Sequence, residues 1–287
     1  MDQFLDKPLS PSRANQFRDC ELLYRYRTID KLPERPSPAA VRGTLVHNVL
    51  ESMFGMEAPS RTPDNVVALL PEALASMLTE NPSIVYAVES TLEWSPEAAV
   101  METQPTPSPE SVASFIEIAT GLVEAYFALE FPQELNPTAL EMKVNTRLDS
   151  GVEVHGIIDR FETNGGGAIR ISDYKTGKAP DARWEDKSWF QMLFYALITW
   201  RDKGVIPAEL RLIFLGNSRI LSKSPTESEL LKTENTINQI ARDIKEAVMT
   251  GNFKPRKSGL CQFCTHKDIC TEFGGKILPL PYTPIER

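Results

Sequence analysis

The stretch VEVHGIIDRFETNGGGAIRISDYK (Val152–Lys175) decides the fold. Apolar and polar residues alternate in its two halves, which predicts two β-strands, and the glycines Gly165–Gly167 between them predict a tight turn. A turn centred on these glycines places Asp159 of the first strand directly opposite Asp173 of the second. The stretch therefore predicts a β-hairpin that carries two facing carboxylates.

The facing aspartates indicate a metal site. Like charges on opposed residues repel, and a divalent cation such as Mg²⁺ or Mn²⁺ removes that cost because carboxylates supply the hard oxygen ligands it prefers. Lys175 shares the face of Asp173, where its ammonium can orient an attacking water or stabilise charge on a phosphate. The backbone carbonyl of Tyr174 is a further candidate ligand. The alternative is a solvated acidic hairpin with a surface lysine, and an isolated D-x-K pattern favours that alternative.

Polar residues on neighbouring elements are candidates for the same site. GTLVH sets Gly43 and His47 one helical turn apart, where the glycine would allow another backbone to approach and the histidine could bind a metal. Glu141, on the preceding predicted strand, offers a further carboxylate. Gln191 and Tyr195 occupy positions i and i+4 of one helix and can bond phosphate or a nucleophilic water. Packed or surface roles are the alternatives, and spacing alone favours a surface pair for Gln191 and Tyr195.

The chain around the hairpin predicts an α/β fold in which a small mixed sheet is flanked by helices. Frequent prolines and the lack of a chemical motif predict a helical insertion over residues 57–137. All segments together predict a single domain over residues 1–287. The expected strands are 140–148, 152–161, 168–175 and 209–215, and the expected helices are 9–27, 39–54, 66–78, 111–129, 184–203 and one through 230–248.

Charge and hydropathy exclude some classes of protein. The net charge of −8 argues against a protein that coats nucleic acid through bulk charge, although a local basic groove remains compatible with it. No stretch approaches the ~20 consecutive apolar residues of a membrane helix. The first residues, MDQFLDKPLS, include acidic side chains and lack an apolar signal core. We therefore expect a cytoplasmic protein.

The four cysteines indicate a second metal site. Cys261, Cys264 and Cys270 lie close together, and Cys20 lies near the other end of the chain. In a reducing compartment this arrangement favours a metal or iron–sulfur site over disulfides, and Zn²⁺ with His266 in place of Cys20 is a competing arrangement. Such a site would join residues 9–27 to residues 252–273. The nearby basic residues could contact a DNA backbone or form a solvated loop; they are Lys254, Arg256, Lys257 and Lys267.

These motifs together resemble the RecB-like exonucleases of the PD-(D/E)XK superfamily. The resemblance is strongest to the iron–sulfur branch, which includes the CRISPR-associated adaptation nucleases and the nuclease domain of AddB. The matching features follow the family's order along nearly the whole chain. They are LSPSRANQFRDCELLYRY, GTLVH, GIIDR, SDYKTGK, QMLFY and CQFCTHKDIC.

The resemblance implies a role for each matching residue. It implies that His47, Asp159 and Asp173 bind the catalytic metal and that Lys175 is catalytic. It further implies that Gln191 and Tyr195 position DNA or the lysine. The cysteines Cys20, Cys261, Cys264 and Cys270 would bind a 4Fe–4S cluster, which favours iron over Zn²⁺.

We therefore expect a metal-dependent DNA exonuclease that hydrolyses phosphodiester bonds, prefers single strands or free ends, and acts in DNA repair, recombination or defence. The alternative is a catalytically silent scaffold subunit that binds DNA ends and is stabilised by an iron–sulfur or zinc site. The sequence has no phosphate-binding GxxxxGK[ST] motif. The expected partners are consequently DNA and, for a subunit, a separate helicase or repair complex.

Overall fold

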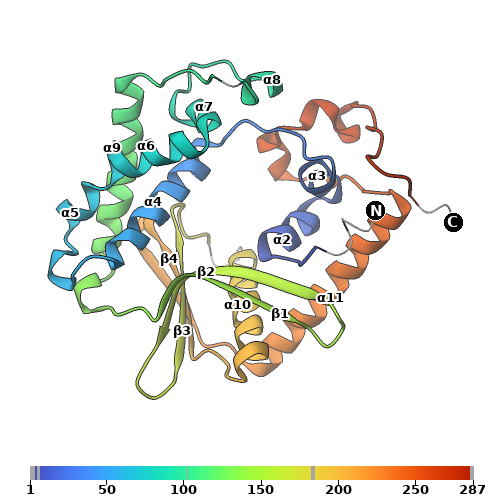
Figure 1. Cartoon of the computed structure of the whole chain (residues 1–287). Coiled ribbons are helices and arrows are strands. Elements are labelled where there is room, and N and C mark those ends of the chain that lie inside the picture. Colours follow the sequence, from blue (N-terminus) through green and yellow to red (C-terminus); the bar gives the residue numbers. More distant parts are fainter. Residues whose placement is uncertain (1–3, 5–6, 102, 182–184, 285–287) are drawn as a thin grey trace.

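A five-stranded mixed sheet forms the centre of the protein (Figure 1). The computed structural model describes residues 4, 7–101, 103–181 and 185–284. The strands lie in chain order; β3 and β4 are parallel and the other neighbours antiparallel, which confirms the predicted α/β mixed sheet. The strands are β1 (Ala139–Arg147), β2 (Glu153–Thr163), β3 (Ile169–Lys175), β4 (Glu209–Phe214) and β5 (Arg219–Lys223), of which β5 was not predicted.

The hairpin between β2 and β3 has the predicted register. Arg160 pairs with Ser172 and Phe161 pairs with Ile171, as expected for a turn on the three glycines. Gly167 has a φ of +80°, a conformation that glycine adopts without a steric penalty. The paired ladder ends one position before Asp159 and Asp173, at the edge where the candidate site lies.

Helices account for most of the remaining elements. The α-helices are α2 (Pro11–Asp19), α3 (Glu21–Tyr24), α4 (Pro38–Phe54), α5 (Pro63–Val67), α6 (Leu70–Glu80), α7 (Val85–Val88), α8 (Pro96–Ala99), α9 (Pro109–Phe127), α10 (Asp186–Lys203) and α11 (Glu227–Thr250). Short turns of 3-10 helix are η2 (Ala58–Ser60), η3 (Pro82–Ile84), η4 (Pro132–Glu134), η6 (Leu215–Asn217), η7 (Gly259–Phe263), η8 (Lys267–Ile269) and η9 (Thr271–Phe273), and η1 (Arg25–Ile29) is a π-helix.

Two segments that the sequence predicted as single continuous helices are each divided into two helices. The helix expected over residues 9–27 breaks at Cys20, whose backbone is extended, because the next residues contact the C-terminal segment: the N–H of Leu22 donates to the carbonyl of Lys254. The helix expected over 66–78 divides into α5 and α6. Pro71 lies in the first turn of α6, where its missing N–H is tolerated, and it could not lie inside a continuous helix. Trp184, the first residue of another predicted helix, lies outside the described residues.

The sheet has a separate hydrophobic core on each face. Successive residues of a strand point to opposite faces, so Leu212 of β4 joins one core and Ile213 joins the other. The first core packs the sheet against α2, α3, α10 and α11, and the second packs it against α4, α5, α6 and α9. The end of the sheet between α4 and α10 therefore lies where the two hydrophobic cores meet.

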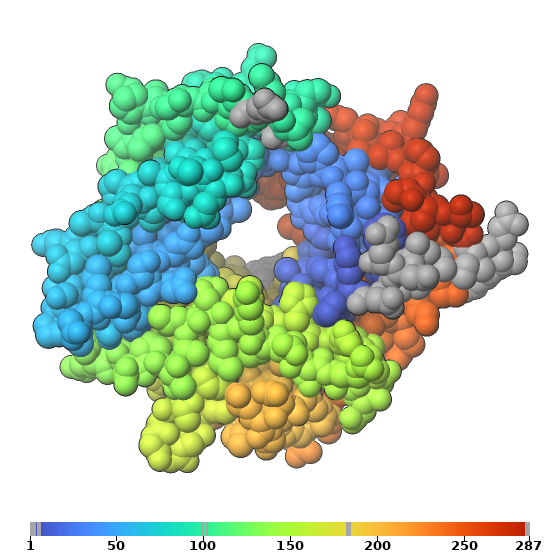
Figure 2. All heavy atoms as spheres, viewed as in Figure 1, coloured from blue at the N-terminus to red at the C-terminus, as the bar shows by residue number. Residues whose placement is uncertain are grey.

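The space-filling view shows an opening through the molecule (Figure 2). The N-terminal region and α4, both in blue, border it above the green β1–β2 region. Within the described ranges, no helix is long and apolar enough to cross a membrane.

Candidate active site

A chain of polar contacts links the end of β3 to α10. The ammonium of Lys175 lies 2.7 Å from Oδ2 of Asp173 and donates a hydrogen bond to Oε1 of Gln191 at 2.9 Å. The amide nitrogen of Gln191 lies 2.9 Å from both Oδ1 of Asp173 and the hydroxyl of Tyr195. Asp173 and Lys175 share a face of the strand as predicted, and Gln191 and Tyr195 contact both each other and this pair.

A second group of side chains gathers next to this chain. His47 of α4, Glu141 of β1 and Asp159 of β2 each place a potential ligand atom within 4.8 Å of the other two. Nδ1 of His47 lies 3.5 Å from Oδ2 of Asp159, and Nε2 lies 3.0 Å from the carbonyl oxygen of Tyr174. The backbone N–H of Tyr174 donates to Oδ2 of Asp159 at 2.7 Å. The site thus joins both neighbouring helices to the end of the β2–β3 hairpin.

The electrostatics of this group suit a divalent cation. Burial, followed by the charge of Asp173, raises the pKa of Asp159 well above its ordinary value. Burial and the nearby acids Glu51 and Asp173 raise the pKa of Glu141, and burial lowers the pKa of His47, which favours the neutral imidazole that a metal binds. Crowded carboxylates beside a neutral histidine therefore form a donor set that fits Mg²⁺ or Mn²⁺.

Glu141 reaches this group through a local distortion of β1. The pairing of β1 with β2 joins Leu140 to Arg160 and resumes with Met142 and Ile158, so Glu141 lies at the position facing Asp159. Its φ is +42°, a left-handed conformation that costs a non-glycine residue about 1–2 kcal/mol. The sequence left a surface role for Glu141 open, and the structure places its carboxylate with His47 and Asp159.

Two glycines in the motifs differ in their surroundings. A Cβ atom on Gly156 would lie 2.5 Å from Cε1 of Tyr195, so only glycine lets this ring rest against β2. A Cβ atom on Gly43 would lie 3.4 Å from the side-chain oxygen of Thr176, an ordinary contact. The expectation that Gly43 permits the approach of another backbone is therefore wrong, and Gly156 is the glycine that a side chain would disturb.

Replacing Gly156 with alanine should lower the rate of the hydrolysis that the sequence predicts for this site by about 10²-fold, because the added methyl displaces Tyr195 and with it the Gln191 amide that holds Asp173 and Lys175. The measurement is kcat for the DNA substrate expected from the sequence, with circular dichroism to verify folding. Gly43→Ala is the matched control and should stay within about twofold of wild type. Equal losses in the two variants would contradict this role of Gly156.

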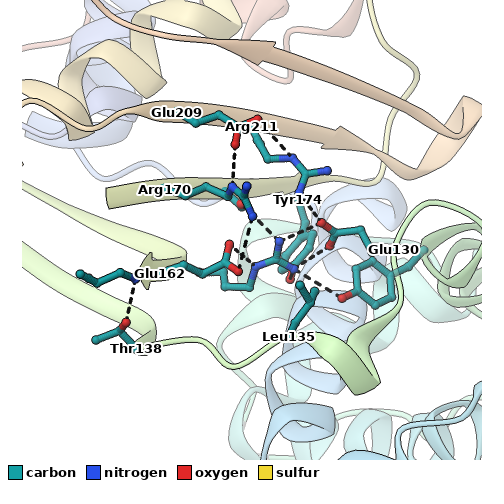
Figure 3. A network of polar contacts seen from close by, with 12 residues as sticks. Glu130, Leu135, Thr138, Glu162, Arg170, Tyr174, Glu209 and Arg211 are labelled. Carbon is teal, nitrogen blue, oxygen red and sulfur yellow. Dashed lines mark hydrogen bonds and ion pairs between the residues drawn. The ribbon is translucent and has the colours of Figure 1, made fainter. Parts of the chain in front are cut away.

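A buried ion-pair network supports the site from the face of the sheet that packs against α9 (Figure 3). Arg160, which is fully buried, forms two ion-pair contacts with Glu130, at 2.6 and 2.9 Å, and donates to the hydroxyl of Tyr174 at 3.0 Å. Arg211 of β4 contacts the same carboxylate at 2.7 Å. Glu130 follows α9, so the network connects the helical region to the strand that carries Asp173.

Tyr174 transmits this network to the site. Its phenol lies in the network, while its backbone N–H and carbonyl face Asp159 and His47. No motif or spacing in the sequence predicts the contact between Arg160 and Glu130. The one sequence feature that could have drawn attention to Arg160 is its position directly after Asp159, on the other face of the strand.

The four cysteines, Cys20, Cys261, Cys264 and Cys270, line one pocket of about 280 Å³. The backbone N–H of Arg256 contacts Sγ of Cys20 at 3.4 Å, which joins the two ends of the chain. In the part of the chain that the structure describes, no three thiols form a group within 4.8 Å. Four thiolates on one Zn²⁺ would lie about 3.8 Å apart, given Zn–S bonds of about 2.3 Å. The described arrangement is therefore not that of a closed zinc site.

His266 is engaged elsewhere. It is buried, and its Nε2 lies 2.8 Å from Oε1 of Glu34, which also accepts from Arg27. Burial opposes ionisation of Glu34, but the hydrogen bonds from His266 and Arg27 outweigh it and lower the pKa of Glu34 to about 2. His266 thus ties the cysteine segment to the residues after η1, and among the described residues it belongs to no group of metal ligands, unlike the alternative considered for it.

Comparisons with known proteins show the family of this chain. The chain is 25% identical over 280 residues to the Gene 69 protein of Mycobacterium phage D29, which covers 92% of this chain and 96% of that protein. A crystal structure of SSO0001 matches 56% of this chain and 78% of its own, with a TM-score of 0.37 and 18% identity. The model of the PD-(D/E)XK nuclease superfamily matches residues 8–271, and this chain belongs to that superfamily.

Proposed function

We propose that this PD-(D/E)XK nuclease is a DNA exonuclease that depends on Mg²⁺ or Mn²⁺ and prefers single strands or free ends. Membership of the superfamily makes it a metal-dependent hydrolytic nuclease. The observation that carries the proposal is the contact between Asp173, Lys175 and Gln191 directly beside the donor group of His47, Glu141 and Asp159. Carboxylates that can hold a divalent cation, with an ammonium beside them, can support phosphodiester hydrolysis.

Each side chain has a role in this proposal. His47, Asp159, Glu141 and the carbonyl of Tyr174 would hold the cation together with Asp173. When bound, the cation would polarise the scissile phosphate and lower the pKa of a water. Lys175 would orient that water and stabilise the charge that develops on the phosphate.

Gln191 and Tyr195 are proposed to position this lysine. Gln191 accepts from the ammonium of Lys175 while its amide meets Asp173 and the hydroxyl of Tyr195, so it fixes the lysine relative to the carboxylate. Fixing a reacting group in this way raises the rate because less orientational freedom is lost in the transition state.

The opening beside the site supports a preference for single strands. It passes through the molecule between α4 and the β1–β2 region, the elements that carry His47, Glu141 and Asp159 (Figure 2). A flexible strand with a free end can thread through an enclosed opening. A closed circle has no end to thread, so it could enter only if the protein opened. This favours digestion from ends.

We also place the chain in the iron–sulfur branch of the RecB-like nucleases. The shared pocket of Cys20, Cys261, Cys264 and Cys270 supports a 4Fe–4S module formed by residues 9–27 and 252–273. Residues 57–137 would be a helical insertion in a single nuclease domain, because the second hydrophobic core packs its helices on β3 and β4. DNA repair, recombination or defence is the proposed setting, and a separate helicase or repair complex is the proposed protein partner.

Linear and circular single-stranded DNA of the same sequence distinguish this proposal from its alternatives. With Mn²⁺, the linear molecule labelled at one end should be degraded and the circle should persist. Comparable cleavage of the circle would replace the exonuclease with an endonuclease. Binding of the linear strand without cleavage at any concentration of Mg²⁺ or Mn²⁺ would instead favour a silent DNA-end-binding scaffold.

A further inference from the structure

A basic pocket lies between the N-terminal segment, the β1–β2 turn and α11. It has a volume of about 640 Å³. One acidic residue, Glu153, lines it together with five basic residues, which are Lys7, Arg13, Arg147, Arg242 and Lys245. This concentration of positive charge contrasts with the net charge of −8 of the whole chain. A local basic concavity in an acidic protein attracts an anionic ligand.

Arg13 is held at the edge of this pocket by contacts within the protein. Its Nη1 donates to the carbonyl of Pro8 at 2.8 Å, and its Nη2 donates to the hydroxyl of Tyr24 at 2.7 Å. Its Nε is buried and finds no hydrogen-bond partner in the described parts of the chain. The two hydrogen bonds hold the guanidinium of Arg13 beside the pocket, where its charge adds to that of the other basic residues.

A continuous row of exposed side chains leads from this pocket to the candidate active site. Residues of β1 and β2 that pair directly share a face of the sheet. The successive exposed pairs are Arg147 with Glu153, Asn145 with His155, and Lys143 with Ile157, and the next position holds Glu141 and Asp159. Arg147 and Glu153 line the pocket, while Glu141 and Asp159 belong to the donor group.

The row has the chemistry of a nucleic-acid contact surface. Lys143 supplies a cation, and Asn145 and His155 supply hydrogen-bonding groups. Ile157 exposes 44% of its surface, which can contact the face of a base. The distance from Glu153 to Asp159 is about 20 Å, because a strand rises about 3.3 Å per residue. The strand pair runs from the centre of the molecule toward α11 (Figure 1), and its length matches that of several nucleotides.

We infer that a DNA strand held at the active site continues along this row and that the basic pocket binds its phosphates. The inference rests on the proposed function and adds to it a second contact region, remote from the chemistry. The ligand of the pocket is thus the phosphodiester backbone of the substrate or product strand. The basic side chains of the pocket would neutralise phosphates far from the active site. They should therefore strengthen the binding of long strands and leave the hydrolysis step unchanged.

The double variant Arg242→Gln/Lys245→Gln tests the inference, because both residues are exposed on α11 and neither touches the active site. In the Lys175→Ala background with Ca²⁺, the affinity for a labelled 12-nucleotide strand, followed by fluorescence anisotropy, should fall about tenfold. The slope of log Kd against log salt should decrease by about 1.4, since each phosphate contact to a single strand contributes about 0.7. With Lys175 intact, kcat/KM for thymidine 5′-p-nitrophenyl phosphate should stay within twofold of wild type, because this small diester occupies only the metal site.

The matched control is Lys203→Gln/Lys232→Gln, which removes the same charge at exposed positions of α10 and α11 away from the pocket. It should leave both readouts unchanged. Three results would overturn the inference and leave the proposed function standing. They are equal losses of DNA affinity in the two double variants, an unchanged salt slope, and a loss of small-diester cleavage in the pocket variant. If the Lys175→Ala protein with no further change binds no DNA, the proposed function fails together with the inference.

Discussion

Replacing Lys175 with methionine should reduce the cleavage of single-stranded DNA by about 10²–10³-fold, the usual loss when one group that stabilises transition-state charge is removed. Methionine keeps most of the length of the side chain and removes the ammonium that contacts Asp173 and Gln191. The measurement is the single-turnover rate on an end-labelled strand with saturating Mn²⁺.

Two comparisons separate a chemical role of Lys175 from a structural one. The melting temperature in the presence of Mn²⁺ should change little, because the cation compensates the buried Asp173 that has lost its partner. Lys175→Arg keeps the charge but changes its shape and donor geometry, so it should restore only part of the rate. Wild-type cleavage by Lys175→Met would rule out this lysine as part of the active site.

Replacing Glu130 with glutamine should destabilise the protein by about 3 kcal/mol, because the buried guanidinium of Arg160 loses its two shortest ion-pair contacts and keeps only the contact with Glu162 at 3.2 Å as a counter-charge. Arg211 loses the same partner. The free energy of unfolding can be measured with urea at pH 7. The matched control is Glu124→Gln, an equal change of charge at an exposed position of α9, which should stay within about 0.5 kcal/mol of wild type.

The effect of Glu130→Gln should also depend on pH. Burial raises the pKa of Glu130, but hydrogen bonds and charge from Arg160, with Arg211, outweigh it, and the net pKa lies below the ordinary 4.5. A carboxyl group with a lowered pKa in the folded state stabilises the fold above the unfolded pKa and loses this contribution as the pH falls through the folded value. The advantage of wild type over Glu130→Gln should therefore be complete above about pH 4.5 and shrink below it. A difference in the free energy of unfolding between wild type and Glu130→Gln that is small at pH 7, or that stays constant as the pH falls below about 4.5, would contradict the importance of the network.

The parts of the fold that the sequence predicted are those specified by local patterns. The hairpin follows from alternation and from glycines at its turn, and its register places Asp159 and Asp173 at corresponding positions. The contact between Gln191 and Tyr195 follows from their spacing on α10. These features require only the geometry of one helix or of two adjacent strands.

The parts that were missed depend on contacts between distant segments. Glu141 faces Asp159 only because of the register between β1 and β2 and because of its own strained backbone. Glu130 and Arg160 meet across thirty positions of the chain, which no periodicity specifies. Likewise, the helix break at Cys20 follows from contact with a segment more than two hundred residues away.

The position of Mn²⁺ in a crystal of the Lys175→Met protein, located by anomalous scattering, tests the central claim most directly. This variant lacks the ammonium of Lys175 but keeps every candidate metal ligand, so it should still bind Mn²⁺. We predict an anomalous peak among the side chains of His47, Glu141 and Asp159, and its loss when Asp159 is also replaced by asparagine. Crystals grown at saturating Mn²⁺ that show no peak among these side chains would contradict the assignment of this end of the β2–β3 hairpin as a metal-dependent nuclease site.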